Sequence, residues 1–316
     1  MRVLLATMAL ELGGAETHVV SLAGALKRKG LDVEVASSGG ALVEALEEAG
    51  IEHHFLPLDR RSPLALAAAV GQLRTLLRRR RYDLIHAHAR IPAWVAEQAR
   101  RRGVAPVALV TTYHGVYAAG WFWRRFTVLG DATIAVSEDV RDHLIRRLGA
   151  RPDQVRLIPN GIGLGHFLAA AEPGGLGPTP YPSVLHVSRL SEFADTALAL
   201  AQAAPELARH HPGFRLRIAG AGTRLQEVRR AAEEAARRAG YPVVEVLGAR
   251  RDIPSLLVRS WVVVAVARSA LEAMAAARPV IICGQGGYGG LLEPSSLPRF
   301  EPRNFTARGT GRPIDA

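Results

Sequence analysis

Short apolar runs alternate along the chain with longer segments in which apolar residues recur every three or four positions. The runs are rich in Val, Ile, Leu and Ala, as buried strands are, and the longer segments are typical of amphipathic helices. This alternation predicts an α/β fold of parallel sheets joined by crossover helices. In the first half we expect strands at residues 3–6, 32–36, 84–87, 108–112, 133–136 and 155–158, and helices at 16–29, 42–49, 64–80, 93–101 and 138–148.

The alternation stops near the middle of the chain and then starts again. Residues 173–182 are rich in Gly and Pro and lack periodicity, which predicts an interdomain linker. The economical architecture is two doubly wound domains, residues 1–172 and 183–316, that face each other across a cleft. In the second domain we expect strands at residues 184–187, 215–218 and 243–247, and helices at 195–209, 223–238 and 253–258.

The segment from residue 261 to residue 290 carries the most informative order of elements. A β-branched run is followed by a helix that begins at Arg268 and bears Glu272, then by a second apolar strand and by the Gly-rich residues 284–290, which we expect to form a loop. In an open parallel sheet, ligands bind outside the carboxyl ends of the strands. An acid there can bind sugar hydroxyls, and a Gly-rich loop lets the backbone approach a phosphate. This order predicts a nucleotide or nucleotide-sugar pocket.

Composition describes a soluble globular protein. The chain has 316 residues, of which 48% are hydrophobic and 22% charged, so a disordered chain is excluded. The single Cys283 excludes an internal disulfide, suits a reducing compartment and is expected to be buried at the end of a strand. We find no secretory signal and no apolar run near the ~20 residues that span a bilayer, so we expect a cytoplasmic protein.

The chain carries a net charge of +11, and three Arg runs, at residues 78–81, 100–102 and 124–125, all lie in its first half. Nucleic acid, anionic lipid headgroups or a phosphorylated substrate could each attract them. Nothing resembles a nucleic-acid-binding motif, and aromatic residues at 6% offer little stacking surface, so we expect no nucleic acid. Any one run is explained by solvated helix ends, but together they favour an anionic membrane surface. Residues 119–126, which include Trp121, mix aromatic and basic side chains as a membrane interface would; packing beside an acceptor site is the alternative.

Three histidines lie at two of the expected strands, either within the strand or just after it. His114, in Tyr113-His114-Gly115, can serve as a hydrogen-bonding or acid/base group in a cleft, or can simply pack at the base of a loop. His86 and His88 lie on one face of a strand. A zinc site needs further ligands, and none has a suggestive spacing, so we expect no metal. The pairs 53–54 and 210–211 are expected at the surface.

Three weaker motifs lie at strand ends. Gly13 and Gly14 open a helix, whose amides favour an anion, or they form a tight turn. Arg189 ends the first strand of the second domain and could meet a diphosphate or be a surface charge. Gly220 and Gly222 end the next strand, where they could admit a base or a phosphate or form a plain turn.

Taken in order, these motifs resemble the retaining, GT-B-fold glycosyltransferases of family 4 (glycosyl transferases group 1). The resemblance implies two Rossmann-like domains and transfer of a sugar from a UDP- or GDP-linked donor, with no cofactor and no essential metal. The implied acceptor is a cell-envelope, polysaccharide or lipid-linked glycan. The motifs that carry the resemblance span nearly the whole chain: Gly13-Gly14-Ala15-Glu16, Tyr113-His114-Gly115, Ala135-Val136-Ser137-Glu138, Ile158-Pro159-Asn160-Gly161, Ser188-Arg189-Leu190, Gly220-Ala-Gly222 and Leu271-Glu272-Ala273-Met274-Ala275.

The resemblance also implies roles for individual residues, with the donor mainly on the second domain. Glu272 matches the glutamate that binds the donor ribose, Arg189 the arginine on the diphosphate, and His114 the histidine near the donor sugar. The further donor-side residues are Gly13, Gly14, Gly220, Gly222, Arg268, Ser269, Gly286 and Gly287, and the acceptor-side residues are Glu16, Tyr113 and Trp121.

This sequence departs from the family pattern in three places. The family often carries a second glutamate eight positions before Glu272, where this chain has Val264. The family lysine that follows the arginine is missing, and the C-terminal domain is expected to be short. We expect Arg268 to replace the missing phosphate contact. A non-catalytic or degenerate nucleotide-sugar-binding paralogue stays open as a second interpretation.

Overall fold

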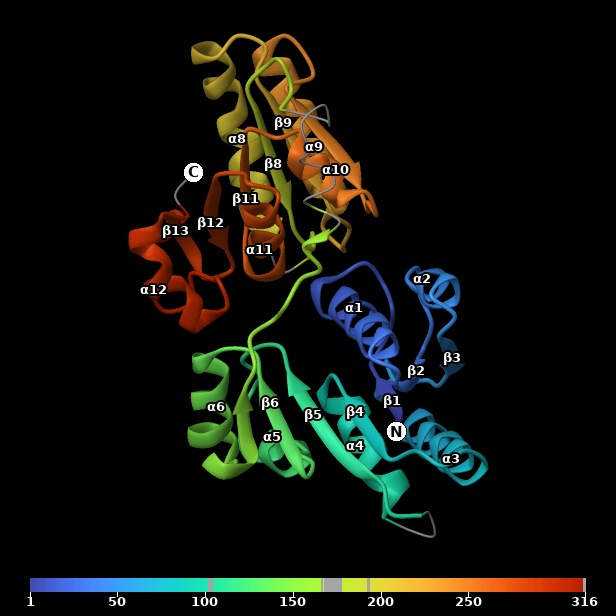
Figure 1. Cartoon of the computed structure of the whole chain (residues 1–316). Coiled ribbons are helices and arrows are strands. Elements are labelled where there is room, and N and C mark those ends of the chain that lie inside the picture. The colour runs from blue at the N-terminus through green and yellow to red at the C-terminus, as the bar shows by residue number, and fades with distance from the viewer. Residues whose placement is uncertain (102–104, 166, 168–177, 192–193, 315–316) are drawn as a thin grey trace. The chain divides into compact units, whose positions relative to one another are not determined.

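The computed structural model describes residues 1–101, 105–165, 167, 178–191 and 194–314, which form two compact units, Met1–Gly161 and Ile162–Ala316 (Figure 1). Each unit is a mainly parallel sheet with helices packed against it, as the alternating pattern predicts. The predicted linker is residues 173–182, and its first half, residues 173–177, lies outside the described residues. No helix in the described part of the chain is long and apolar enough to cross a membrane.

The sheet of the first unit has the strand order β3-β2-β1-β4-β5-β6-β7, and every neighbouring pair in it is parallel. This order confirms a doubly wound arrangement, because the chain runs outward from β1 in both directions. Its elements are β1 (Arg2–Ala6), α1 (Gly14–Arg28), β2 (Asp32–Ser37), α2 (Val43–Glu48), β3 (Glu52–Phe55), α3 (Pro63–Arg79), β4 (Leu84–Ala87), α4 (Arg90–Arg100), β5 (Ala108–Tyr113), α5 (Trp121–Phe126), β6 (Ala132–Ala135), α6 (Glu138–Leu148), the 3-10 turn η1 (Pro152–Gln154) and β7 (Val155–Leu157).

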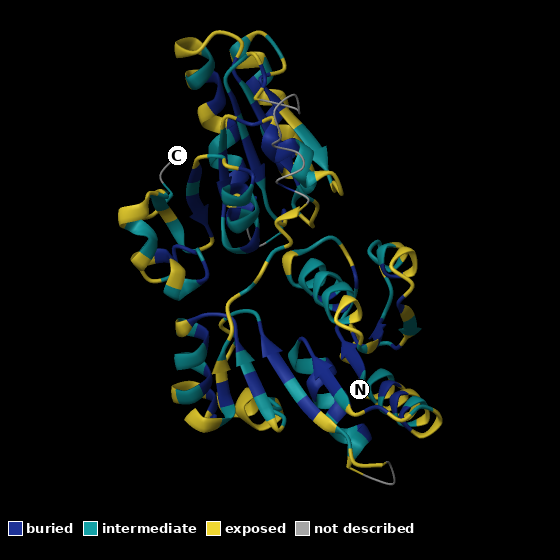
Figure 2. Ribbon diagram, in the orientation of Figure 1, coloured by how far each residue is buried: buried dark blue, intermediate teal, exposed yellow. Residues whose placement is uncertain are grey.

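Both faces of this sheet are buried, as Figure 2 shows by its dark strands between lighter helices. Along β1, Leu4 and Ala6 join the core that α3 and α4 cover, whereas Val3 and Leu5 join the core under α1. Successive side chains of a strand point to opposite faces. A strand covered on both faces must therefore be apolar throughout, and for this reason the run at β1 is continuous and not alternating.

Two elements of the first unit are missing from the sequence prediction. The strand β3 is polar, and its histidines are expected at the surface; that expectation is wrong for His53 and His54. His53 Nε2 lies 2.8 Å from Ser37 Oγ, and His54 Nε2 lies 2.6 Å from Glu34 Oε2. The strand is recognisable only through partners on β2. The short helix α5 has no buried residue, so no apolar stripe marks it.

The second unit has the strand order β10-β9-β8-β11-β12-β13, in which only the pair β12–β13 is antiparallel. Cys283 is buried near the end of β12, as expected. The described elements are β8 (Ser183–Val187), α8 (Ala194–His210), β9 (Arg215–Ala219), α9 (Leu225–Ala239), β10 (Val244–Gly248), α10 (Ile253–Val258), β11 (Val262–Ala265), α11 (Ala267–Ala275), β12 (Val280–Gly284), β13 (Gly287–Leu291), η2 (Pro294–Ser296), α12 (Leu297–Phe300) and η3 (Glu301–Arg303).

The Gly-rich segment 284–290 is not a loop, which corrects the expectation. Residues Gly287–Leu291 form β13, an edge strand antiparallel to β12. A Cβ on Gly286 would lie 2.5 Å from the carbonyl carbon of Ala307, and one on Gly287 would lie 2.1 Å from the carbonyl oxygen of Arg312. These two glycines therefore make room for the C-terminal backbone of the chain. Periodicity could not reveal this strand because Gly has no side chain to alternate.

Candidate functional site

The carboxyl edge of the second sheet carries a nearly buried ion pair. Arg268 Nε donates to Glu272 Oε1 over 2.8 Å, one turn apart on α11, and the two side chains are only 10% and 13% exposed. Burial raises the pKa of Glu272 above its usual value, although the guanidinium opposes this effect. At the start of a helix that follows a parallel strand, a guanidinium group can bind an anion and a carboxyl group can bind a hydroxyl.

The entry into α11 is strained. Ala267, the first residue of the helix, has a φ of +52°, and its amide donates to the carbonyl oxygen of Phe305 over 3.0 Å. A residue other than Gly or Asn adopts this left-handed conformation only where its surroundings impose it, and such residues cluster at functional sites. Here the left-handed residue directly precedes Arg268 and so fixes the direction in which the helix starts.

Val264, which stands where the resemblance places a second glutamate, is a core residue of β11. It is 2% exposed and pairs in register with His186 on β8 and Ile281 on β12. Its carbonyl oxygen lies 2.9 Å from Nδ1 of the buried His186, whose Nε2 lies 2.8 Å from Ser188 Oγ. This part of the strand belongs to the core, so Glu272 on α11 is the candidate acid of this edge of the sheet.

Arg189 lies on an exposed loop that follows β8, and two glycines support that loop. A Cβ on Gly220 would lie 1.9 Å from the carbonyl oxygen of Ser188, and one on Gly222 would lie 2.3 Å from the carbonyl carbon of Leu190. Hydrogen bonds join Leu190 N to Ala221 O and Arg224 N to Leu190 O. Gly220 and Gly222 therefore leave room for the backbone of residues 188–190. This close packing fixes the loop that carries Arg189.

A hollow of about 500 Å³ opens at the same edge of the second unit. The start of α8 borders it with Asp195 and Thr196, β12 ends at it, and residues 311–314 close one side. Its volume lies within the range of small-ligand sites. Gly286 and Gly287 are among its lining residues and, having no side chains, can offer a ligand only their backbone.

Four imidazoles gather at the carboxyl edge of the first sheet. His88 and His114 follow β4 and β5 directly, His86 lies on β4 and His18 on α1. The ring centroids of His18 and His114 are 5.1 Å apart, and those of His88 and His114 are 5.6 Å apart. His88 Nδ1 lies 3.3 Å from His114 Nε2, and His86 Nε2 lies 2.7 Å from Thr112 Oγ1.

Burial favours the neutral form of His86, His88 and His114. It lowers the pKa of His86 to about 4 and that of His114 to about 3, and nearby imidazoles add to the effect. The pKa of His88 is lowered well below its usual value by the same causes. The reason for expecting no metal, that further ligands are lacking, does not hold, because the nitrogen atoms of His18, His88 and His114 all lie within 4.8 Å of one another.

The remaining first-unit residues of the predicted site differ in accessibility. Gly13 is the N-cap of α1, where a Cβ would lie 2.3 Å from Glu16 Oε2, so both residues belong to one tight helix start next to Gly14. Tyr113 is fully buried and donates its hydroxyl to the carbonyl of Val128 over 2.8 Å. Its side chain therefore supports the strand end before His114. Trp121 is 84% exposed.

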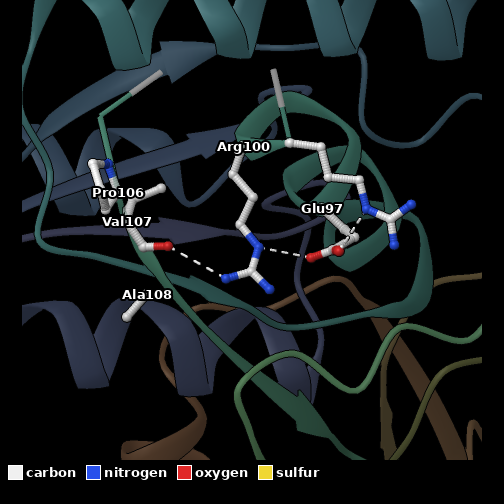
Figure 3. A pocket seen from close by; sticks show the side chains of 6 residues that line it. Glu97, Arg100, Pro106, Val107 and Ala108 are labelled. Atoms are coloured by element: carbon white, nitrogen blue, oxygen red, sulfur yellow. Dashed lines mark hydrogen bonds and ion pairs between the residues drawn. The ribbon is translucent and has the colours of Figure 1, made fainter. Parts of the chain in front are cut away.

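An open hollow in the first unit lies at the other edge of its sheet (Figure 3). It is bordered by the end of α4 and the start of β5, which is an amino end. Figure 3 shows Arg100 bound to Glu97 and to the carbonyl of Val107, and Arg100 also pairs with Asp131. Because ligands of parallel sheets bind at carboxyl ends, and these charges are already paired, we do not assign a site here.

Comparisons with known proteins match both halves of the chain. The model of Glycosyltransferase Family 4 matches residues 12–165, and the model of Glycosyl transferases group 1 matches residues 181–296. The chain is 24% identical over 229 residues to a phosphatidyl-myo-inositol mannosyltransferase of Propionibacterium freudenreichii, and this match covers 67% of this chain and 59% of the relative. It is 25% identical over 270 residues to a phosphatidylinositol N-acetylglucosaminyltransferase chain of Arabidopsis thaliana, covering 79% and 57%. The chain thus spans somewhat less than three fifths of both relatives' length.

Solved structures share the fold. A glycosyltransferase from Rickettsia africae superposes with a TM-score of 0.72 at 21% identity, over 88% of this chain and 78% of that one. HepE from Anabaena, in complex with UDP-glucose, superposes with a TM-score of 0.67 at 20% identity, over 98% and 93%. Since the two family models cover most of the residues in the order of the two units, and the solved relatives have the same two-unit architecture, the chain belongs to the GT-B-fold glycosyltransferases of family 4, group 1.

Proposed function

We propose that this protein transfers a sugar from a UDP- or GDP-linked donor to a glycan or lipid-linked acceptor of the cell envelope, with retention of configuration and no metal cofactor. The observation that carries the proposal is the Arg268–Glu272 pair, nearly buried at a strained helix start on the carboxyl edge of the second sheet. The names of the two relatives, which both specify a phosphatidylinositol-type acceptor, favour a lipid-linked acceptor.

In this proposal the donor nucleotide binds to the second unit. The carboxyl group of Glu272 accepts hydrogen bonds from the ribose hydroxyls, and Arg268 turns its guanidinium to the diphosphate. Arg189, on its exposed loop, supplies a second cation. Two cations and helix-start amides stabilise the negative charge that develops on the leaving diphosphate, which is the task a metal performs in other transferases. Ser269 adds a backbone amide in the first turn of α11.

The chemical step then exchanges one bond at the anomeric carbon for another. The bond to the diphosphate oxygen breaks, the acceptor hydroxyl oxygen forms the new glycosidic bond on the same face, and its proton passes to the leaving phosphate. His114, neutral through burial, accepts or donates a hydrogen bond at the donor sugar and needs no change of charge. Glu16 and Gly13 at the start of α1 lie in the acceptor-side unit.

We also propose that the protein works at the cytoplasmic face of a membrane. The helix α5 has no buried residue and exposes Trp121, Phe122 and Phe126 next to Arg124 and Arg125. Aromatic and basic side chains on one short helix suit an interface with anionic headgroups. An acceptor that is anchored in lipid would then be within reach of the enzyme.

The first experiment is a thermal-shift panel of UDP- and GDP-sugars, followed by transfer to a lipid extract with and without EDTA. We expect one donor to raise the melting temperature, because a ligand of the native state stabilises it, and transfer to persist in EDTA. Glu272→Gln should remove the shift, whereas Glu233→Gln, an exposed change on the same unit, should keep it. A shift without transfer to any extract supports the degenerate paralogue, and no shift and no hydrolysis with any donor refutes the donor site.

A further inference from the structure

Three histidines that are remote in sequence meet in the first unit. His18 comes from the second turn of α1, His88 follows β4, and His114 follows β5. The strands β1, β4 and β5 are neighbours in the sheet, so their carboxyl ends deliver these side chains to one place. His88 is 2% exposed, and the other two are partly buried.

The nitrogen atoms of these residues have the spacing of a metal site. One ligand nitrogen of each of the three lies within 4.8 Å of those of the other two. His88 Nδ1 and His114 Nε2 are 3.3 Å apart. Two nitrogen ligands of a tetrahedral zinc ion, each about 2.0–2.1 Å from the metal, are separated by about 3.3–3.4 Å.

One ring nitrogen of His88 lacks a hydrogen-bond partner among the described residues. Nε2 of His88 is buried and makes no hydrogen bond with any described residue. A buried nitrogen without a partner costs about 1–3 kcal/mol. Because the contact with His114 is made by Nδ1, the unpartnered Nε2 is on the other side of the ring, and the case for a metal rests on the spacing of the three ligand nitrogens.

We propose that His18, His88 and His114 bind one divalent transition metal ion of the zinc type, with a fourth position for water. Neutral imidazoles suit Zn²⁺, Co²⁺ and Ni²⁺ and bind Mg²⁺ poorly. His86 is not a ligand in this arrangement. Its ring lies 4.1 Å from that of His88, and its Nε2 is bonded to Thr112, so it fixes the orientation of the His88 ring.

The direct test titrates the full chain, without a His tag and stripped with EDTA, with Zn²⁺, Co²⁺ and Mg²⁺. We expect calorimetry to give one equivalent of Zn²⁺, the melting temperature to rise with Zn²⁺, and bound Co²⁺ to show the visible bands of a four-coordinate site with three nitrogen ligands and one water. Mg²⁺ should do none of these. Absence of saturable Zn²⁺ binding overturns the proposal, and because it is measured on the unaltered chain, no folding defect can explain it.

Variants assign the ligands. His18→Ala and His114→Gln should each weaken Zn²⁺ binding by more than the 10- to 100-fold that loss of an outer partner costs. His210→Ala, which removes an exposed histidine of the second unit, should leave it unchanged. Circular dichroism verifies that each variant is folded. Binding that persists in the folded His18→Ala, His114→Gln double variant places the metal elsewhere and overturns the assignment.

One consequence rests on the proposed function. A metal bound to His114 withholds that imidazole from the donor sugar, so one equivalent of Zn²⁺ should inhibit transfer and EDTA should restore it. Zn²⁺ binding in a protein that transfers no sugar contradicts the proposed function and leaves the metal site standing. Full activity of the Zn²⁺-loaded enzyme contradicts the contact of His114 with the donor.

Discussion

At the scale of single residues, Arg268 and Glu272 pose a problem of desolvation. Taking two charges out of water costs several kcal/mol for each ion, and their attraction offsets this cost only with good geometry. The pair has that geometry, at 2.8 Å between Arg268 Nε and Glu272 Oε1, yet burial still raises the pKa of Glu272. Because the Arg268–Glu272 pair adds little to the stability of the fold, a phosphate and a ribose can replace its internal hydrogen bond at low cost.

Replacing Arg268 by Lys tests whether the fork of the guanidinium matters. Lys keeps the charge but loses the two parallel donors that match a phosphate. We expect donor affinity, measured by calorimetry with the sugar nucleotide that gives a thermal shift, to fall about 10- to 100-fold, which is the value of about one hydrogen bond to a charged group. Arg229→Lys, at an exposed position on α9, is the matched control. Equal affinity in both variants would contradict the phosphate role.

The buried His186 makes the second unit sensitive to acid. Burial lowers its pKa from 6.5 to about 4, so between these values the unfolded chain binds a proton that the native state does not. Stability from this group is complete above pH 6.5, is lost as the pH falls towards 4, and changes no further below that. At ~1.36 kcal/mol per pKa unit the loss reaches about 3 kcal/mol.

Urea unfolding at a series of pH values measures this effect. In His186→Asn, whose side chain does not titrate, the fall in the free energy of unfolding between pH 6.5 and pH 4 should be smaller than in the unaltered protein. The amide of Asn can still reach the carbonyl oxygen of Val264, which limits other losses. Identical pH profiles would show that His186 is not the group responsible.

At the scale of elements, the loop that carries Arg189 depends on glycines of the next strand end. Gly220 has a φ of +155° and lies against the carbonyl oxygen of Ser188, so Gly220→Ala brings both backbone strain and a clash. We expect the free energy of unfolding to fall by about 1–3 kcal/mol. We also expect weaker donor binding, because the loop that carries Arg189 moves. Gly71→Ala, in an open position on α3, should be neutral or stabilise by about 0.5–1 kcal/mol. Chemical denaturation of both variants gives the comparison.

At the scale of the whole molecule, the charge of +11 and the exposed face of α5 act together. We expect the protein to float with vesicles that contain anionic phospholipid, to stay unbound to phosphatidylcholine alone, and to be released by high salt, since exposed charges are screened beyond about a Debye length. Trp121→Ser with Arg124→Ser should reduce flotation several-fold without changing donor binding. Equal flotation with both kinds of vesicle would contradict the membrane proposal.

Much of the fold could be predicted from the sequence. Helices and strands covered by a core show the period of 3.6 or the continuous apolar run that burial demands, and nearly all of these were predicted within a few residues. Three of the misses, β3, α5 and β13, have one property in common, which is that they lack an apolar pattern. Edge strands and a fully exposed helix need none, because their stability comes from hydrogen bonds to a neighbour or from a few local contacts.

The sequence by itself determined the alternation of elements, the family motifs and the positions of polar residues at strand ends, because each is written in local order. Only the tertiary structure decided which of them meet. His18, His88 and His114 converge because β1, β4 and β5 are adjacent, and no spacing in the chain encodes that order. Likewise, Gly220 and Gly286 admit neighbouring backbone, which a motif for phosphate binding cannot reveal. The periodicity of the sequence indicates which residues are buried. Strand order and packing decide which other residues they contact.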